Sequence, residues 1–226
     1  MYADKKPIPK SIQYTVKPIV VNIVNAEATA LQGLRIEMAD SVGINIVTSQ
    51  KVNVRDCEIV LCGQEGINVE ASSVQIENNN INNCLSAGIR TRGEGRVVVT
   101  RNNLSNIGLI AGRGYGRNAI YLMGGNSEVS YNRITNVGYI GIQHSGGNNL
   151  IRRNIIDTYN LVTWDGGAMY TNHNQKGTII EENIIKNGMA NMVGTRTGDS
   201  TISEETPLCS GIQCDLWTSD IIIRYC

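Results

Sequence analysis

Two aspartates, Asp165 and Asp215, stand beside the last two copies of a repeated phrase and are the residues best suited to carry chemistry. Asp165 directly precedes the copy at 168–171, separated from it by two glycines, and Asp215 directly follows the copy at 211–214. Paired carboxylates hydrolyse glycosidic bonds when one acts as a general acid and the other as a base or nucleophile. Carboxyl groups about 5 Å apart suit a retaining mechanism and groups about 6.5–9.5 Å apart an inverting one, and the sequence leaves both open. A turn-capping role for Asp165 and an ordinary surface position for Asp215 are the structural alternatives.

Further polar and aromatic residues accompany this pair on neighbouring copies of the phrase. Tyrosine and tryptophan rings can stack on sugar rings, and arginine guanidinium groups can bind the carboxylate of a uronate. A histidine in the exposed turn 172–177 could act as a base, although a surface role is equally open. The predicted substrate-binding residues are Arg90, Arg92, Tyr121, Gln143, Trp164, Tyr170 and Asn172, and His173 joins the two aspartates as a predicted catalytic residue.

The phrase consists of a glycine or alanine, an apolar residue, a more polar residue and a further small or apolar residue. Its first three copies start 23 and then 22 residues apart, and a fixed period of this length indicates a stacked-repeat protein. The alternation within each copy has a period of two, which is a strand pattern, and the prevailing residues are poor helix formers. The seven copies are 43–46, 66–69, 88–91, 119–122, 141–144, 168–171 and 211–214.

A coil of about 22 residues with three short strands and three bends predicts an all-β fold, the right-handed parallel β-helix. Each strand pairs with its equivalent one coil away, so equivalent residues form ladders along the axis. The second and fourth residues of each phrase are expected to point inward, which puts His144 in the core. The third residue of each phrase is expected to point outward, and these residues form one polar surface that also carries aromatic rings.

Asparagines recur at the bend that follows the second strand, and we expect them to supply the left-handed conformation that such a bend needs. Proline cannot donate to a sheet ladder, and it is absent from 19 to 206. The six cysteines fit the ladders better than a disulfide framework. Buried free thiols are therefore predicted, with a Cys62–Cys84 bridge between adjacent coils as the alternative. These asparagines are Asn79, Asn102, Asn132, Asn154 and Asn183.

The chain of 226 residues carries 20 basic and 20 acidic side chains. This balance gives no reason to expect nucleic acid as a partner, and no apolar run is long enough to span a membrane. The first residues lack the apolar segment of a signal peptide. A single β-helix domain over 1–226 is expected, as a fragment whose incomplete last coil continues or stacks on a neighbour. Insertions at 109–118, 158–167 and 189–210 all precede a copy of the phrase and predict a binding edge there.

The segment Asp165-Gly-Gly-Ala-Met-Tyr-Thr resembles a motif of secreted bacterial right-handed parallel β-helix proteins of the pectate-lyase-like superfamily, which carry Asp-Gly-Gly-(Ala/Gly)-Ile-Tyr-Thr. One coil later such proteins carry Gly-Ile-Tyr-Leu-Asp-Asp, where this chain has Gly211-Ile-Gln-Cys-Asp-Leu and keeps only the first aspartate. The resemblance covers about residues 18 to 226. It implies a carbohydrate-active protein of the glycoside hydrolase or polysaccharide lyase type, located in the periplasm or outside the cell.

Three functions fit these residues. Hydrolysis of a polysaccharide or oligosaccharide by Asp165 and Asp215 is the leading hypothesis, and it needs no cofactor. The second is a polysaccharide lyase, which needs a base and a calcium ion or an arginine to neutralise a uronate. Arg90, Arg92, Tyr170 and His173 are its candidates, and no dense acidic cluster suggests calcium. The third is a glycan-binding or structural β-helix without catalysis, which the lost second aspartate favours.

Overall fold

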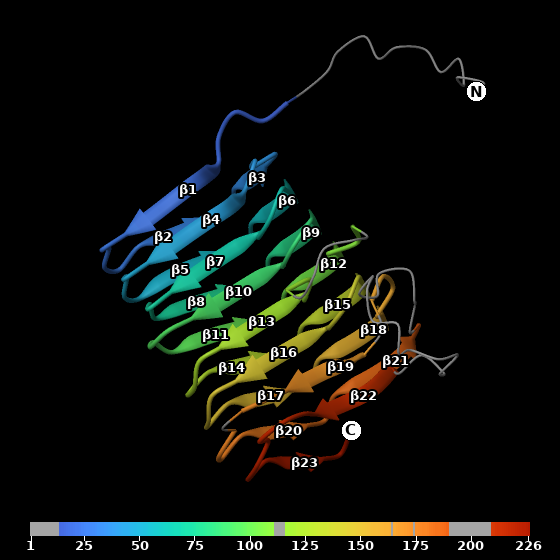
Figure 1. The fold of residues 1–226 in the computed structure, drawn as a ribbon. Coiled ribbons are helices and arrows are strands. Elements are labelled where there is room, and N and C mark those ends of the chain that lie inside the picture. The colour runs from blue at the N-terminus through green and yellow to red at the C-terminus, as the bar shows by residue number, and fades with distance from the viewer. Residues whose placement is uncertain (1–13, 111–115, 164, 174, 190–208) are drawn as a thin grey trace, which may run out of the picture.

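The computed structural model describes residues 14–110, 116–163, 165–173, 175–189 and 209–226, and their regular structure is all strand (Figure 1). The strands form three parallel sheets that run side by side from the N-terminal to the C-terminal end. Each full coil contributes one strand to each sheet, which confirms the predicted parallel β-helix. The described residues include no helix that could cross a membrane.

The first sheet carries the repeated phrase, and the second and third sheets carry the two following strands of each coil. The strands of the first sheet are β1 (Ile19–Val24), β4 (Val42–Val47), β7 (Ile67–Glu70), β10 (Ile89–Arg92), β13 (Ile120–Met123), β16 (Ile142–Ser145), β19 (Gly166–Thr171) and β22 (Cys209–Cys214). Those of the second are β2 (Ala30–Gln32), β5 (Val52–Arg55), β8 (Val74–Glu77), β11 (Val97–Thr100), β14 (Glu128–Ser130), β17 (Leu150–Arg152), β20 (Ile179–Glu181) and β23 (Ile222–Arg224). Those of the third are β3 (Arg35–Glu37), β6 (Glu58–Cys62), β9 (Asn80–Cys84), β12 (Asn103–Ile107), β15 (Arg133–Val137), β18 (Ile155–Tyr159) and β21 (Ile184–Gly188).

The register of the first sheet places equivalent residues of the phrase opposite one another. Ile44 lies opposite Ile67, and Ile142 lies opposite Met169. All four side chains are buried, whereas Asn45 between the inward positions is partly exposed. Stacked branched side chains therefore fill a narrow core without phenylalanine, and the predicted ladders are confirmed.

The asparagines at the second bend form a buried ladder inside the wall of the coil. The backbone N–H of Asn79 donates to Oδ1 of Asn102 at 2.9 Å, and the N–H of Asn102 donates in the same way to Asn132. The residues before them, Arg101 and Tyr131, are the left-handed ones, with φ of 56° and 58°. The prediction that these asparagines supply the left-handed bend is therefore wrong by one position. Their amides are needed inside, where they satisfy buried backbone groups of the bend.

Removing an inward amide is expected to cost far more stability than removing an outward one. The Asn102 side chain accepts from the N–H of Asn79 and donates to the carbonyls of Ile76 and Thr100. Asn102→Ala leaves these buried groups unpaired and should lower the free energy of unfolding by about 3 kcal/mol. Asn103 is exposed, so Asn103→Ala should change it by less than about 0.5 kcal/mol. Equal losses for the two variants in urea denaturation would contradict this internal role.

All six cysteines are free, as predicted, but their burial differs from the prediction. Cys57, Cys62 and Cys84 are buried, and Cys62 lies opposite Cys84 without a bridge. Cys214 and Cys226 are exposed, so the predicted burial is wrong for them. Cys214 keeps its expected register, but β22 is the last described strand of its sheet, so no further described strand covers it along the axis.

The connections from the third sheet to the first lie at one edge of the stack, and the long ones are concentrated there. Residues 108–119, 160–165 and 189–208 make the long connections, whereas 138–141 link β15 to β16 directly. The described residues of the first two predicted insertions lie on this edge. The bounds of two insertions need correction, because 158–159 and 166–167 belong to strands β18 and β19, and 209–210 belong to β22. Most of the third insertion lies outside the described residues.

Candidate functional site

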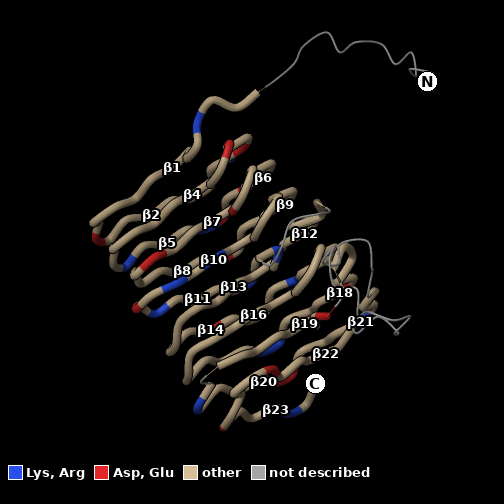
Figure 2. The backbone as a smooth tube through the Cα atoms, viewed as in Figure 1, with Lys and Arg blue, Asp and Glu red and all other residues tan. Residues whose placement is uncertain are grey.

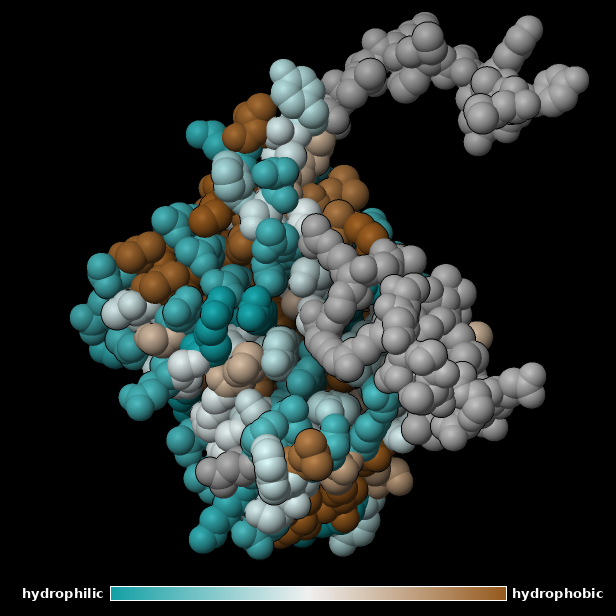
Figure 3. Space-filling model, viewed as in Figure 1, coloured by the Kyte–Doolittle hydropathy of each residue, from teal (hydrophilic) through white to brown (hydrophobic). Residues whose placement is uncertain are grey.

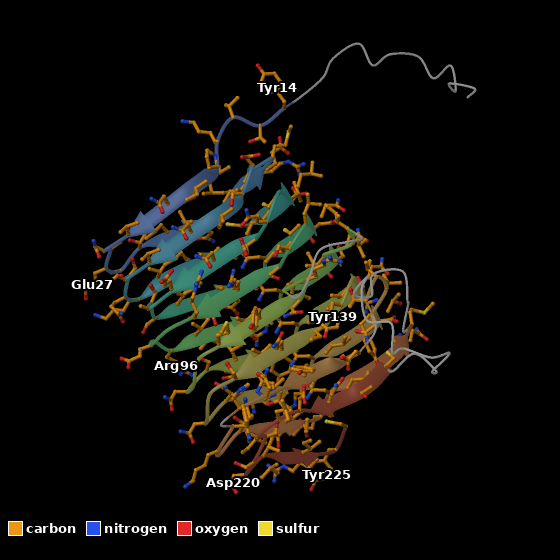
Figure 4. All side chains as sticks on the ribbon, in the orientation of Figure 1. Tyr14, Glu27, Arg96, Tyr139, Asp220 and Tyr225 are labelled. Carbon is orange, nitrogen blue, oxygen red and sulfur yellow. The ribbon has the colours of Figure 1, made fainter. Side chains whose placement is uncertain are left out.

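A groove of about 520 Å³ lies on the outer face of the first sheet, at the edge where the connections from the third sheet enter. Its floor carries Arg90, Tyr121, Gln143 and Tyr170, which follow one another in register from β10 to β19. The groove therefore runs along the axis of the β-helix, with one of these residues per coil. Figure 4 labels Tyr139 at the same edge. The lining residues are Ser86, Arg90, Gly116, Tyr121, Tyr139, Ile140, Gln143, Asp165, Tyr170, Asn172 and Asp215.

Most of the predicted site residues meet in this one groove. They come from five consecutive coils, and the two aspartates lie on the last two of them. The strand register explains this gathering, because an outward position repeats on the same side of every coil. The predicted residues that line the groove are Arg90, Tyr121, Gln143, Asp165, Tyr170, Asn172 and Asp215; their roles stay predictions.

Two predicted residues lie elsewhere, and a third, Trp164, lies outside the described residues. Arg92 is exposed and its Nε is 3.8 Å from Oε2 of Glu70, so it does not line the groove. His173 does not line it either. This residue has a left-handed φ of 56°, and its ring packs edge-on against Trp217, with 4.9 Å between the ring centroids. His173 thus lies in the exposed turn after β19, as expected, but its ring packs on Trp217 and does not line the groove.

Asp215 is held as a carboxylate by two hydrogen-bond donors. The hydroxyl of Tyr170 donates to Oδ2, and the backbone N–H of Leu216 donates to Oδ1 at 2.7 Å. Its own backbone N–H donates to the carbonyl of Thr171 at 2.9 Å, which ties it to the preceding coil. The hydrogen bond from Tyr170, followed by that from Leu216, lowers the pKa of Asp215 below its ordinary value. The site therefore contains one carboxylate that stays ionised at neutral pH.

Asp165 lies in a turn with a left-handed backbone conformation, and the hydroxyl of a tyrosine donates a hydrogen bond to its backbone carbonyl. Its φ is 61°, a left-handed value, and its backbone carbonyl accepts a hydrogen bond of 2.7 Å from the hydroxyl of Tyr139. Gly166 follows because a Cβ there would lie 2.6 Å from the ring of Tyr139. Within the described part of the chain, the carboxylate of Asp165 has no hydrogen-bond donor. The two aspartates thus sit in different environments, although they line the same groove.

The opposite end of the groove holds a charged and aromatic cluster. Nη1 of Arg90 lies 3.2 Å from Oε1 of Glu65, a residue that is only 5% exposed. The guanidinium carbon of Arg90 also lies 5.9 Å from the centroid of the Tyr121 ring, within cation–π distance. Further along, Nδ2 of Asn118 donates to Oε1 of Gln143 at 2.7 Å. The floor is thus fixed by hydrogen bonds before any ligand arrives.

Sequence reasoning missed Ser86, Gly116, Tyr139 and Ile140, which also line the groove. All of them lie in the connections that lead into the first sheet, outside the periodic strands. The available signal was the position of the insertions, which predicts that this edge contributes to the site. It does not indicate which connection residue turns toward the groove.

His144 is in the core, as predicted. Its side chain is fully buried between its ladder neighbours Leu122 and Thr171. Burial lowers the pKa of His144 to about 4, and the contact with the side chain of Gln175 offsets only part of that effect. The imidazole is therefore neutral at physiological pH and takes no part in the groove.

The described residues include no group of three or more His, Cys, Asp or Glu side chains that could hold a metal ion. Calcium needs six to eight oxygen ligands. The groove contributes Asp165 and Asp215, and both oxygens of Asp215 already accept from Tyr170 and Leu216. The described residues of the groove therefore do not fit the calcium ion that a lyase would use.

The fold resembles several solved structures of carbohydrate-active proteins. A glycoside hydrolase shares 13% identity at a TM-score of 0.59, over 80% of this chain and 37% of its own. An alginate lyase from Paenibacillus sp. str. FPU-7 shares 14% identity at a TM-score of 0.56, and the match covers 89% of this chain and 92% of the lyase. The DFA-IIIase of Arthrobacter chlorophenolicus A6, in complex with GF2, shares 15% identity at a TM-score of 0.52. That match covers 84% of this chain and 55% of the DFA-IIIase. At these identities the similarity establishes a common fold, and the chain spans little more than a third of the glycoside hydrolase.

No curated protein matches the chain. A family model described as "Right handed beta helix region" matches residues 20–104 and 42–226, which together cover most of the chain. The match agrees with three parallel sheets whose strands stack in chain order. The chain therefore belongs to the right-handed beta helix family.

Proposed function

We propose that this protein hydrolyses glycosidic bonds of a glycan bound in the groove. The observation that carries the proposal is that Asp165 and Asp215, from consecutive coils, line one groove together with two tyrosines of the first sheet. Carboxylate pairs beside a sugar-binding cleft are the usual machinery of glycoside hydrolysis. Such an enzyme would meet its glycan outside the cytoplasm, the location that the motif resemblance implies.

The two aspartates are assigned different roles because their surroundings differ. Donors from Tyr170 and Leu216 keep Asp215 ionised, so Asp215 is the base or nucleophile. Asp165 has no such donors in the described part of the chain and is exposed, so its carboxyl group is open to a bound glycan and we assign it the role of general acid. Glycoside hydrolysis needs one carboxyl group as the acid and the other as the base or nucleophile.

The reaction follows from these roles. Asp165 donates its proton to the glycosidic oxygen while the bond between that oxygen and the anomeric carbon breaks. Asp215 either attacks the anomeric carbon directly or takes a proton from a water molecule that attacks it. In the first case water later displaces Asp215, and Asp165 takes the proton from that water. Both routes end with a free reducing end. The route through direct attack returns both carboxyl groups to their starting states. The route through water leaves Asp165 ionised and Asp215 protonated, and proton exchange with solvent then restores them.

A lyase that acts on uronates is less well supported by the groove. A lyase must neutralise the uronate carboxylate to acidify the neighbouring proton. Arg90 is already paired with Glu65, and Arg92 lies outside the groove beside Glu70. The carboxylates of Asp165 and Asp215 add negative charge at the other end.

Product analysis distinguishes the three functions. The protein is incubated with a panel of neutral and acidic polysaccharides, and new reducing ends and the ultraviolet absorbance of unsaturated sugars are followed. New reducing ends without that absorbance support hydrolysis. Unsaturated product would show a lyase, and glycan binding with neither signal across the panel would show a binding protein.

Removing the Tyr170 hydroxyl is expected to move the acidic limb of the pH–rate profile to higher pH. The hydroxyl lowers the pKa of Asp215, and a base or nucleophile works only when ionised, so its loss raises the pH below which activity falls. The measurement is kcat/KM against pH for the wild type and Tyr170→Phe. Tyr121→Phe is the control, because Tyr121 lies on β13, two coils before β19. An unmoved limb in Tyr170→Phe would contradict the role of Asp215.

A further inference from the structure

The charged side chains of the groove do not favour an anionic ligand. Arg90 is the cationic residue among those that line it, and its charge is balanced by Glu65 at 3.2 Å. Asp165 and Asp215 line the groove without a salt bridge among the described residues, and His173 is a nearby group whose positive charge favours the ionised form of Asp215. Figure 2 shows acidic and basic residues interspersed along the stack, with no continuous basic track. With Arg90 balanced by the neighbouring Glu65, the ionised Asp215 leaves the described lining net negative at neutral pH.

This balance bears on the class of glycan that fits. A uronate chain would bring like charges close to two ionisable carboxyl groups in a partly desolvated groove, and like-charge juxtaposition is costly. Hydroxyl groups carry no such cost and can bond to Gln143, Asn172 and the tyrosine hydroxyls. In Figure 3 hydrophilic and neutral residues cover most of the middle coils in the same view. The lining thus suits uncharged sugars.

The spacing of the floor also points to a chain rather than a single sugar. Adjacent parallel strands lie about 4.8 Å apart, so Tyr121 on β13 and Tyr170 on β19 are about 10 Å apart along the axis. From Arg90 to the coil of Asp215 the groove spans about 19 Å. One coil rises by a distance similar to one hexose of an extended glycan, so the groove has room for about four sugars.

The end remote from the aspartates is built to receive a sugar. Arg90 lies over the ring of Tyr121 and is anchored by the buried Glu65. Nε of Arg90 is buried and without a hydrogen-bond partner. A ring held in place in this way offers a flat apolar surface at low entropic cost, which is what stacking against a sugar face requires.

We propose that Arg90, Tyr121 and Glu65 form a remote subsite for an uncharged sugar, and that the groove binds a neutral oligosaccharide of about four residues along the β-helix axis. Glu65 sets this preference by cancelling the charge of Arg90. The inference rests on the proposed function in one respect, that the ligand is a glycan. It does not require that the glycan be cleaved.

The test measures binding by calorimetry to the Asp165→Asn variant, which should not turn over its ligand. The probes are gluco-, xylo-, manno- and fructo-oligosaccharides of two to six residues, together with oligogalacturonates and alginate oligosaccharides of the same lengths. We expect a neutral series to bind, with affinity rising to about four residues and then levelling off. Asp165→Asn removes an ionisable carboxyl group from the groove, so a preference for neutral glycans in this variant is the more demanding result.

Second variants locate the subsite. Adding Tyr121→Ala should weaken binding of the tetrasaccharide about 10-fold and binding of the disaccharide less than about 2-fold. The reason is that stacking on the tyrosine ring contributes about 1 kcal/mol or more. Glu65→Gln leaves the charge of Arg90 uncompensated and should strengthen binding of acidic tetrasaccharides about 10-fold. Arg92→Gln should change binding of neither neutral nor acidic glycans. Circular dichroism checks that each variant is folded.

The inference is overturned if acidic glycans bind in preference, if no neutral series binds, if affinity is flat beyond the disaccharide, or if Tyr121→Ala weakens both lengths equally. These outcomes differ from a failure of the proposed function. Binding of a neutral tetrasaccharide that the wild type never cleaves would refute hydrolysis and leave the subsite in place. Hydrolysis of an acidic glycan would support the proposed function and refute the subsite for an uncharged sugar.

Discussion

Asp215→Asn is expected to keep its fold and to lower kcat at least about 1000-fold on the glycan that the wild type cleaves. The carboxylate is the ionised member of the pair, and asparagine cannot attack an anomeric carbon or take a proton from water. The Oδ1 of asparagine can still accept from the N–H of Leu216, and its NH2 group can donate to the hydroxyl oxygen of Tyr170, so the groove should keep its shape. The measurement is steady-state kinetics, with calorimetry to show that glycan binding persists.

Asp165→Asn should show a loss that depends on the leaving group. In a natural glycan the leaving group is a sugar alkoxide, which is a poor leaving group and needs the proton of Asp165. The rate of cleavage of such a glycan should therefore fall at least about 100-fold. An aryl glycoside leaves without protonation, so its rate should fall far less. Asp220→Asn is the matched control, because Asp220 is exposed, has a left-handed φ of 54° that asparagine tolerates, and does not line the groove. Equal losses on both substrates would remove Asp165 from the role of acid.

Much of the groove was predictable because it is a product of periodicity. Once Ile44 is placed opposite Ile67, every outward residue of the first sheet has a fixed place, and Arg90, Tyr121, Gln143 and Tyr170 follow. The strand ladder needs no knowledge of packing beyond the alternation of side chains. The same reasoning correctly placed His144 inside.

The failures share a cause, which is that a bend does not obey the ladder. Arg101, and not the asparagine after it, takes the left-handed conformation, because the amide of Asn102 is needed by buried backbone groups. His173 leaves the groove at a left-handed turn. The support of Asp165 by Tyr139 is a contact between two connections, and no repeat in the sequence relates them. Sequence periodicity therefore predicts the floor of this site better than its rim.

Acidification from pH 7 to pH 4 is expected to destabilise this protein by about 3 kcal/mol through His144 alone. The side chain is fully buried, and burial lowers its pKa to about 4 from an ordinary value of about 6.5. The folded state therefore binds this proton less readily than the unfolded state. Its contribution to stability is complete above about pH 6.5 and is lost as the pH falls towards 4.

The ladder neighbours of His144 and the side chain of Gln175 offer no counter-ion, and Gln175 offsets only part of the effect of burial. The ladder neighbours Leu122 and Thr171 do not titrate, and Gln175, whose Nε2 donates to the carbonyl of His144 at 3.3 Å, carries no charge. A protonated imidazole would thus be a buried cation without a counter-ion, and such a group is strongly unfavourable. Unfolding, or local opening of the coils that contain β16 and β19, is the way in which the ring can gain its proton.

The chain has two histidines, which makes the control direct. Urea denaturation from pH 7 to pH 4 is compared for the wild type, His144→Leu and His173→Asn. Leucine already occupies the preceding rung as Leu122, so His144→Leu should fold and lose about 3 kcal/mol less on acidification than the wild type. His173 is exposed, and asparagine tolerates its left-handed φ, so His173→Asn should follow the wild type. If His144→Leu loses as much stability as the wild type, then the acid sensitivity arises from the carboxylates and the buried imidazole does not control it.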